Sequence, residues 1–556
     1  MVCKIAPKVD SHSHRVNGEA QDAAEIADYE TALDAAGYGR FSRSVLGACA
    51  CAFFTTGVQN CVMSYVLPAA RCELQLTTYQ AGLINMAFMS GGVASAFFWG
   101  IVGDVFGRKN MLSMTLLVDS TLLLAQSTVS DYRLLLAARS INGFLVGAPS
   151  TLVFPYLSDL VGVKKRQFYL DLIGMSFVAA WLLLPAVAWL VIPFKLATYS
   201  QLPIHSWRLY IALGSIPGFV SGFWVLCLPE SPRLLSDTNR GDEALKIMNE
   251  IHKGNIGSGV EYKIKKIIQD NIFVAKSLNG EENRTKALFV SVLKDLKVFV
   301  SKAYAVKSSL ILFVFFANMA AGFGLNLWIP ELLLRTQGKD CKSVAEQAKV
   351  FNSTSAWKDK GYSAEVDRYN GSYGEKGDTC DGIIDESVFT SGLIVGACCV
   401  LGNVACVAAA RGGGARGVRR SGALCAGACA LACCALAAGA CACAAAAAVP
   451  AAALLNAASL NGNVLLIRLL LHALPARLSG LGVCWGAWWG RAGGVASNLA
   501  VGVLLDYSCP APFLAVAALL TLSIGAIMMI KIETPGQEKT EELSDKGFER
   551  YISTHM

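Results

Sequence analysis

Acidic and lysine side chains are missing from a long stretch of this chain. Between Ser387 and Leu505 there is no Asp, Glu or Lys, although seven arginines occur there. Across all 556 residues only 16% are charged, whereas 54% are hydrophobic and the mean hydropathy is +0.47. A typical soluble domain carries about 25% charged residues. The composition therefore excludes an ordinary soluble protein and favours an integral membrane protein.

The usual signatures of enzymes and of nucleic-acid-binding proteins are also missing. We find no Walker loop, no Ser/His/Asp set and no zinc-like cysteine spacing, so we expect no enzyme, no cofactor and no metal site. No basic patch with interleaved aromatic residues indicates nucleic-acid binding. The net charge of +7 is better explained by the loops of a membrane protein.

Long apolar runs are abundant instead. A helix needs roughly 20 apolar residues to cross the hydrocarbon core of a membrane. Twelve such spans are predicted: 44–68, 79–101, 110–130, 134–158, 168–192, 208–228, 306–333, 388–410, 421–440, 442–466, 480–505 and 511–531. Residues 1–40 are polar and predict a disordered cytosolic tail without a signal peptide, and 533–556 predict a second tail.

Basic residues set the expected orientation of these spans. The outer loops hold few bases, so we expect both termini on the cytosolic side. The predicted inner loops are rich in them: Arg108/Lys109, Lys164/Lys165/Arg166, Arg411/Arg416/Arg419/Arg420 and Arg477.

Two long loops interrupt the pattern. Residues 229–305 separate the two groups of six spans and predict either short amphipathic helices under the membrane or a solvated linker. Residues 334–387 are expected on the luminal or extracellular face. They contain glycosylation sequons at Asn352 and Asn370, and a Cys341–Cys380 disulfide is a hypothesis for this loop.

The loop from Gly100 to Lys109 is the most informative motif. It follows the pattern G-x-x-x-D-x-x-G-R-K, with Asp104, Gly107, Arg108 and Lys109 at the fixed positions. This pattern resembles the signature loop of the major facilitator superfamily, which joins helices two and three on the cytosolic side. The resemblance implies that these residues stabilise one gate of a transporter by charge pairing.

Further motifs in the first half extend the resemblance. Arg139 begins the pattern R-x-x-x-G-x-x-x-G, whose glycines allow two helices to approach closely. Asp159 ends the same helix, and Arg166 lies in the following inner loop. With Pro229-Glu-Ser-Pro-Arg233, these features are similar to the sugar-porter and organic-ion-transporter branches of the superfamily, and they add Arg139, Asp159 and Arg166 to the expected gating residues.

The order of the remaining motifs resembles the synaptic vesicle glycoprotein 2 family. The motifs are Ser64-Tyr-Val-Leu-Pro-Ala-Ala-Arg-Cys72, His205-Ser-Trp-Arg208 and Gly490-Arg-Ala-Gly-Gly494, together with the large loop after helix seven. The resemblance implies an all-α integral membrane protein with twelve transmembrane helices in two pseudo-symmetric six-helix bundles. The bundles would span 41–228 and 306–532, with a central site open alternately to each side.

The sequence departs from the family at positions that matter for ion coupling. Relatives carry an acidic pair in helix one, where this chain has Thr56 and Gln59. A buried carboxylate is the usual proton carrier in secondary transport. Asp119 is the acid nearest the middle of a predicted span, so it is the coupling candidate, with Arg139 as its expected partner. The alternative is a buried residue satisfied by the backbone or by Ser120.

Other intramembrane polar residues suggest a solute site. Arg468 and Arg491 would favour an anionic or carboxylate-bearing solute if they face a cavity unpaired; for Arg468, snorkelling towards an interface is the alternative. Trp189 aligns with an aromatic residue of the ligand site in vertebrate relatives, although packing or an interfacial belt would also explain it. Further pore candidates are Asn318, Asn326, Trp328 and Asn463.

Two functions therefore remain open. The first is secondary transport of a small organic ion or polar solute by a monomer in the plasma membrane or a secretory or synaptic vesicle membrane. The alternative is a non-transporting vesicle glycoprotein that acts through protein partners on its luminal loop and cytosolic tails. The preserved first-half gate loop favours transport, and the missing carboxylates favour the alternative.

Overall fold

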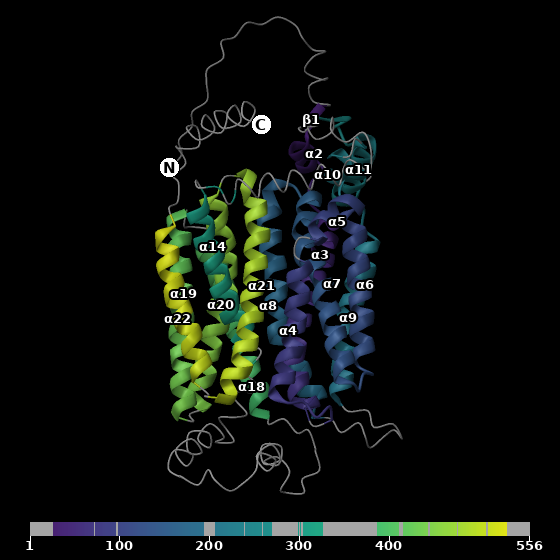
Figure 1. Cartoon of the computed structure of the whole chain (residues 1–556). Helices are drawn as coiled ribbons and strands as arrows, with labels where there is room; N and C mark the ends of the chain where they lie inside the picture. Colours follow the sequence, from purple (N-terminus) through teal and green to yellow (C-terminus); the bar gives the residue numbers. More distant parts are fainter. Residues whose placement is uncertain are drawn as a thin grey trace, which may run out of the picture.

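Two groups of long helices lie side by side in the computed structural model (Figure 1). The described residues are 26–71, 73–95, 98–193, 206–237, 240–257, 259–268, 299, 301, 304–325, 328, 386–410, 415–442, 445–474, 476–507 and 510–530. The first group contains α3 (Arg40–Ala70), α4 (Thr78–Ser95), α5 (Phe98–Phe106), α6 (Arg108–Gln126), α7 (Tyr132–Leu160), α8 (Val163–Val191) and α9 (Ser206–Leu226). The second contains α14 (Ala305–Met319), η2 (Ala320–Leu325), α18 (Glu386–Ala410), α19 (Ala415–Ala442), α20 (Ala445–Ala473), α21 (Ala476–Tyr507) and α22 (Ala511–Met529).

Helices overlap each of the twelve predicted spans. Among the described residues, eight helical stretches are long and apolar enough to cross a membrane by length and composition. The seventh span differs from expectation, because its α-helix changes to the π-helical segment η2 at Ala320. The second and third spans are joined at Gly107, whose φ of +99° suits a residue without a Cβ.

Close helix packing in the first bundle depends on glycine, as its spacing predicted. A Cβ on Gly143 of α7 would lie 1.8 Å from the backbone oxygen of Phe88 in α4. A Cβ on Gly147, one turn further along, would meet the hydroxyl of Ser95. Any larger residue at these positions would therefore push α4 and α7 apart.

A small cap lies at the signature-loop end of the first bundle (Figure 1). It consists of β1 (Ile26–Asp28), α2 (Tyr29–Ala35), α10 (Pro232–Asp237), α11 (Gly241–Ile256) and β2 (Lys266–Ile268). The strands pair in parallel, with Ile26 opposite Lys266. Residues 26–35 are thus ordered, although the sequence predicted a disordered tail through residue 40.

Burial of apolar side chains explains why this part of the tail is ordered. Ala32 and Leu33 of α2 are almost fully buried and join a core that includes Met248 and Ile251 of α11. The Asn255 side chain adds a polar link, since its Nδ2 donates to the Gly37 carbonyl at 2.8 Å. The linker therefore contains a packed amphipathic helix, one of the two forms expected from its sequence.

Several expectations concern residues outside those described. The glycosylation sites Asn352 and Asn370, the cysteines Cys341 and Cys380, and the C-terminal tail 533–556 all fall there.

Candidate functional site

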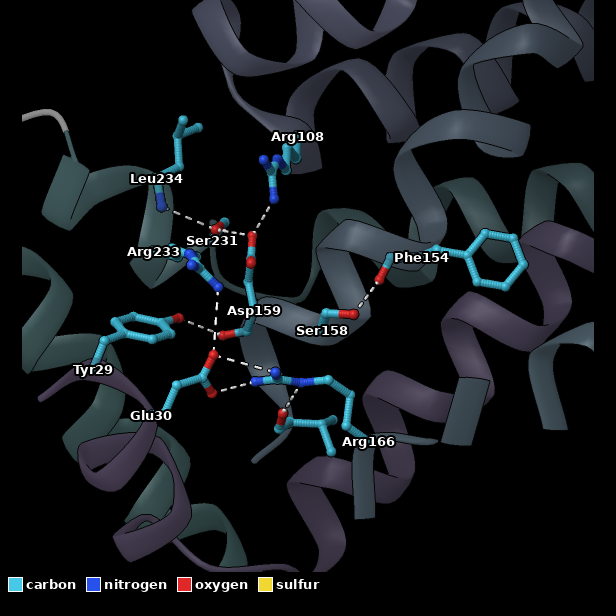
Figure 2. Close-up of polar contacts among 11 residues, drawn as sticks. Tyr29, Glu30, Arg108, Phe154, Ser158, Asp159, Arg166, Ser231, Arg233 and Leu234 are labelled. Atoms are coloured by element: carbon cyan, nitrogen blue, oxygen red, sulfur yellow. Dashed lines mark hydrogen bonds and ion pairs between the residues drawn. The ribbon is translucent and has the colours of Figure 1, made fainter. Parts of the chain in front are cut away.

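An ion pair joins the signature loop to the end of α7. Arg108 donates to Asp159 Oδ2 at 2.5 Å, and the Asp159 side chain is almost fully buried (Figure 2). The hydroxyl of Ser231 donates to the same oxygen at 2.5 Å. Ser231 also accepts from the amide of Leu234 at the start of α10, which fixes the hydroxyl in place. One carboxylate thus connects the loop, α7 and the linker.

The rest of the signature loop is held by Glu230. Its Oε1 accepts from the amide of Lys109 at 3.0 Å, and a Cβ on Gly107 would lie 2.5 Å from its Oε2. Gly107 is therefore required both for its positive φ and for space. The predicted gating residue Asp104 lies within α5, but its side chain is outside the described part of the structure.

A second layer of ion pairs brings the N-terminal segment to this gate (Figure 2). Both oxygens of Glu30 accept from Arg166, at 3.2 and 2.5 Å, and Arg233 lies 3.4 Å from Glu30 Oε1. The Tyr29 hydroxyl donates to the Asp159 carbonyl at 2.8 Å. Burial and the nearby Asp159 carboxylate raise the pKa of Tyr29 well above its usual value, so it remains a donor.

Sequence reasoning missed this second layer. It named Arg166 as a gating residue but gave it no partner, and the observed partner is Glu30. Glu30 lies in the segment predicted to be disordered, so it was not considered. Ala32 and Leu33 are buried apolar residues of the short helix α2, and two neighbouring positions are too few to show a helical periodicity in the sequence.

A buried polar network lies inside the first bundle. Asp119 of α6 accepts from Gln59 Nε2 and from Asn142 Nδ2, each at 2.6 Å. Arg139 donates to Gln59 Oε1 at 3.1 Å and to the Gln59 carbonyl at 3.0 Å, with its guanidinium 4.2 Å from the Phe88 ring centre. All four polar side chains are buried.

This network modifies the prediction for Asp119. Its expected partner Arg139 is nearby but acts through Gln59, whose amide donates to the acid and accepts from the base. The alternative partner Ser120 donates to the Leu116 carbonyl instead. The sequence shows Gln59 only as a position where relatives carry an acid. Its bridging role depends on the packing of α3, α6 and α7 around its side chain, which the sequence does not show.

Two arginines of the second bundle form polar contacts with the first. Arg491 of α21 donates to the Gly92 carbonyl of α4 at 2.7 Å. Within the described part of the chain, the Arg491 side chain makes this one hydrogen bond. Arg468 of α20 lies 3.3 Å from Asp171 of α8. Arg468 is therefore paired with an acid of the other bundle and is not the unpaired cation that was one of its two alternatives. The sequence missed Asp171 because it lies near the edge of a predicted span.

The remaining candidates are divided between the interior and the surface. Asn318 donates to Asn463 Oδ1 at 2.6 Å, which joins two predicted pore residues. Trp328 is buried between Gly82 of α4 and Gly502 of α21, where a Cβ on either glycine would lie within 3.5 Å of its ring. Its Nε1 has no hydrogen-bond partner among the described residues. Trp189 is 38% exposed and does not join these buried groups. Asn326 is outside the described residues.

Sequence comparison identifies a family. The model of the Major Facilitator Superfamily matches residues 48–498. Human synaptic vesicle glycoprotein 2B is 29% identical over 362 residues, which cover 62% of this chain and 52% of the relative. Rat synaptic vesicle glycoprotein 2A is 28% identical over 356 residues, which cover 60% of this chain and 47% of the relative. The chain thus spans about half the length of the curated relatives it matches.

Solved structures show the same fold. An inward-open form of the xylose transporter XylE from E. coli superposes with a TM-score of 0.62 at 13% identity, covering 90% of this chain and 100% of that one. A D-xylose-proton symporter superposes with a TM-score of 0.57 at 15% identity, covering 89% and 99%. At such identity the likeness concerns the fold alone, so any solute must be argued from the site.

Proposed function

The chain belongs to the Major Facilitator Superfamily, and from this premise we propose that it is a secondary active transporter of a small organic ion or polar solute. It is a multi-pass integral membrane protein whose two bundles would expose a central site alternately to each side of the membrane. We propose a plasma membrane or vesicle location, because the relatives named above are vesicle glycoproteins.

Arg491 is the observation that carries this proposal. Its guanidinium lies where α21 meets α4, so it belongs to one bundle and touches the other. Among the described residues no carboxylate forms an ion pair with it. A cation is costly inside a membrane unless it is paired or faces water, and such residues commonly mark solute pathways. An anionic or carboxylate-bearing solute would supply the missing charge.

The Asp119 network supports a coupling role beside this site. Phe88, which the Arg139 guanidinium covers, lies one helical turn from Gly92, which Arg491 contacts. Neutralising Asp119 would leave the Arg139 charge without its acid and would rearrange the Gln59 amide between them. We therefore propose Asp119 as the proton carrier, in place of the acids that relatives have in helix one.

Uptake into proteoliposomes tests the proposal. Labelled organic anions, organic cations and hexoses would be offered to the purified protein, with and without an imposed pH gradient. We expect saturable uptake of an anion. The rate should fall by roughly tenfold or more in Arg491→Gln, since a charge-assisted contact is worth about 1.5–3 kcal/mol. Asp119→Asn should abolish the response to the gradient.

One control variant and two possible outcomes decide between the two functions. Arg240→Gln changes an exposed arginine of α11 and should leave uptake intact. Absence of uptake for the whole panel, from folded and inserted protein, would contradict transport and favour the docking-glycoprotein alternative. Uptake of a cation with equal rates in Arg491→Gln would retain transport but refute the assigned solute charge.

A further inference from the structure

The edge of the cap where α3 begins is basic and exposed. Arg40 and Arg43 lie in the first turn of α3, and Lys253 lies in the last turn of α11. All three side chains are exposed. Among the described residues no carboxylate lies within ion-pair distance of them, and the Nε of Arg43 donates to the Gly39 carbonyl at 3.4 Å instead. These cations can therefore bind an anion from outside the chain.

Direct contacts hold the end of α11 against the start of α3. The amide of Ser42 donates to Asn255 Oδ1 at 3.0 Å, and the Ser42 hydroxyl donates to the same oxygen at 3.2 Å. A Cβ on Gly254 would lie 2.9 Å from the Cβ of Phe41, so the two backbones approach closely. Lys253 precedes Gly254 and is therefore fixed beside the segment that carries the two arginines.

Trp224 marks the level of the membrane surface at this edge. It lies near the end of α9, and its Nε1 donates to the Ser44 hydroxyl at 3.1 Å. A Cβ on Gly47 would lie 2.7 Å from its ring, yet Trp224 and the neighbouring Phe223 are exposed. Exposed tryptophans at the end of a spanning helix are typical of the membrane–water interface. Gly47 follows Arg43 by four residues, so Arg43 lies on the same side of α3, one turn nearer the cap.

Exposed apolar side chains lie beside the cations. Ile256 and Val260, which follow Lys253 in the chain, are 49% and 53% exposed. The Cδ1 of Ile256 would lie 2.8 Å from a Cβ on Gly37, which places this side chain next to the start of α3. Apolar groups next to bases at this level suit the boundary between lipid headgroups and acyl chains, where both kinds of side chain find a partner.

We propose that this basic edge, formed by Arg40, Arg43 and Lys253 with Trp224 and Ile256, binds an anionic phospholipid of the cytosolic leaflet. The arginines would contact the headgroup phosphate, Lys253 would add a third charge, and the acyl chains would lie against Trp224 and Ile256. A zwitterionic headgroup brings its own ammonium to three cations, so an anionic headgroup binds better. The site uses none of the residues proposed for transport and stands whether or not the chain carries a solute.

Native mass spectrometry of the full chain in detergent tests the site, with phosphatidylserine as the probe and phosphatidylcholine of the same acyl chains as the reference. We expect one phosphatidylserine to bind in preference to phosphatidylcholine. Arg40→Gln/Arg43→Gln should weaken phosphatidylserine binding by roughly tenfold or more, and Lys253→Gln by about threefold to fivefold, because each removes charge that faces the headgroup. Equal binding of the two lipids by the folded wild-type chain would overturn the proposal.

The matched control is Lys164→Gln/Lys165→Gln, which removes two exposed cations from the start of α8 at the same end of the bundle. It should leave the preference for phosphatidylserine unchanged. A loss as large as that of the arginine pair would indicate attraction to the whole basic face and would overturn a discrete site. Soluble glycerophosphoserine, which has the headgroup without acyl chains, should compete poorly. Competition at the concentration of the lipid itself would refute a lipid as the ligand.

Fluorescence quenching locates the bound lipid. Phosphatidylserine with brominated acyl chains should quench part of the tryptophan emission of the wild-type chain, and Trp224→Phe should lack that part. The same quenched fraction in both proteins would place the lipid elsewhere and overturn the assignment to this edge.

Discussion

The two bundles share one architecture but stabilise their interiors with different chemistry. The first buries ionisable groups, namely Asp119, Arg139 and Asp159, and gives each specific partners. The second buries neutral amides such as Asn318 and Asn403, and its core is built largely from Ala, Cys and Leu. Small side chains pack adequately but specify little. Under the proposed function, the coupling acid would belong to the first half, whereas the second half would contribute Arg491 to the solute site.

Removal of the buried arginine should produce the largest difference between the halves. Arg139→Met leaves the Asp119 charge without its cation and should lower stability by about 3–5 kcal/mol. Arg419→Met in the second bundle loses one 3.3 Å contact with the Ile530 carbonyl and should cost under about 1.5 kcal/mol. Thermal unfolding in detergent would compare the two.

A double variant checks the cause of that loss. Asp119→Asn combined with Arg139→Met removes both charges and should recover most of the stability. Equal destabilisation by the single and double variants would mean that packing against Phe88, rather than charge, accounts for the effect.

Helix spacing offers a second, smaller contrast. Gly143→Ala places a Cβ against the Phe88 backbone, so α4 and α7 must separate, at a cost of about 1–3 kcal/mol. Gly525→Ala in α22 meets nothing within 4 Å and should stabilise by up to about 1 kcal/mol through helix propensity. Midpoints of chemical unfolding would measure both. If Gly143→Ala were as neutral as Gly525→Ala, the close approach of α4 and α7 would not be required.

Titration of Glu243 in the cap of the first bundle should have the smallest effect on stability. The side-chain hydrogen bond from Arg240 holds the pKa of Glu243 below its usual value. The pair's contribution to stability is therefore present above the unfolded pKa of Glu243 and is lost as the pH falls through its lower folded pKa. Because both groups are fully exposed, Glu243→Gln should leave the melting temperature at pH 7 almost unchanged. A clear drop at pH 7 would contradict this.

The sequence predicted the bundles well because a membrane imposes long apolar helices, and their length and polarity are readable. It also located Arg108 and Asp159, since their motifs have fixed spacing. It could not predict the roles of Glu30, Gln59 or Asp171, because no motif of fixed spacing links these residues to their partners. Polar residues beside a span edge, as Asp171 is, resemble loop residues until the helix packing is known.

The parallel pairing of β1 with β2 has a consequence for biogenesis. Ile26 pairs with Lys266, so β1 is synthesised about 240 residues before its partner. At roughly 5–20 residues per second, the strand waits about 12–48 s, during which the helices of the first bundle are made. Until the linker is made, the apolar face of α2 lacks its contacts with Met248 and Ile251 of α11, and a chain that stalls early would leave part of that face open to chaperones and proteases. Strand closure would therefore mark, at the ribosome, the completion of the first half of the carrier.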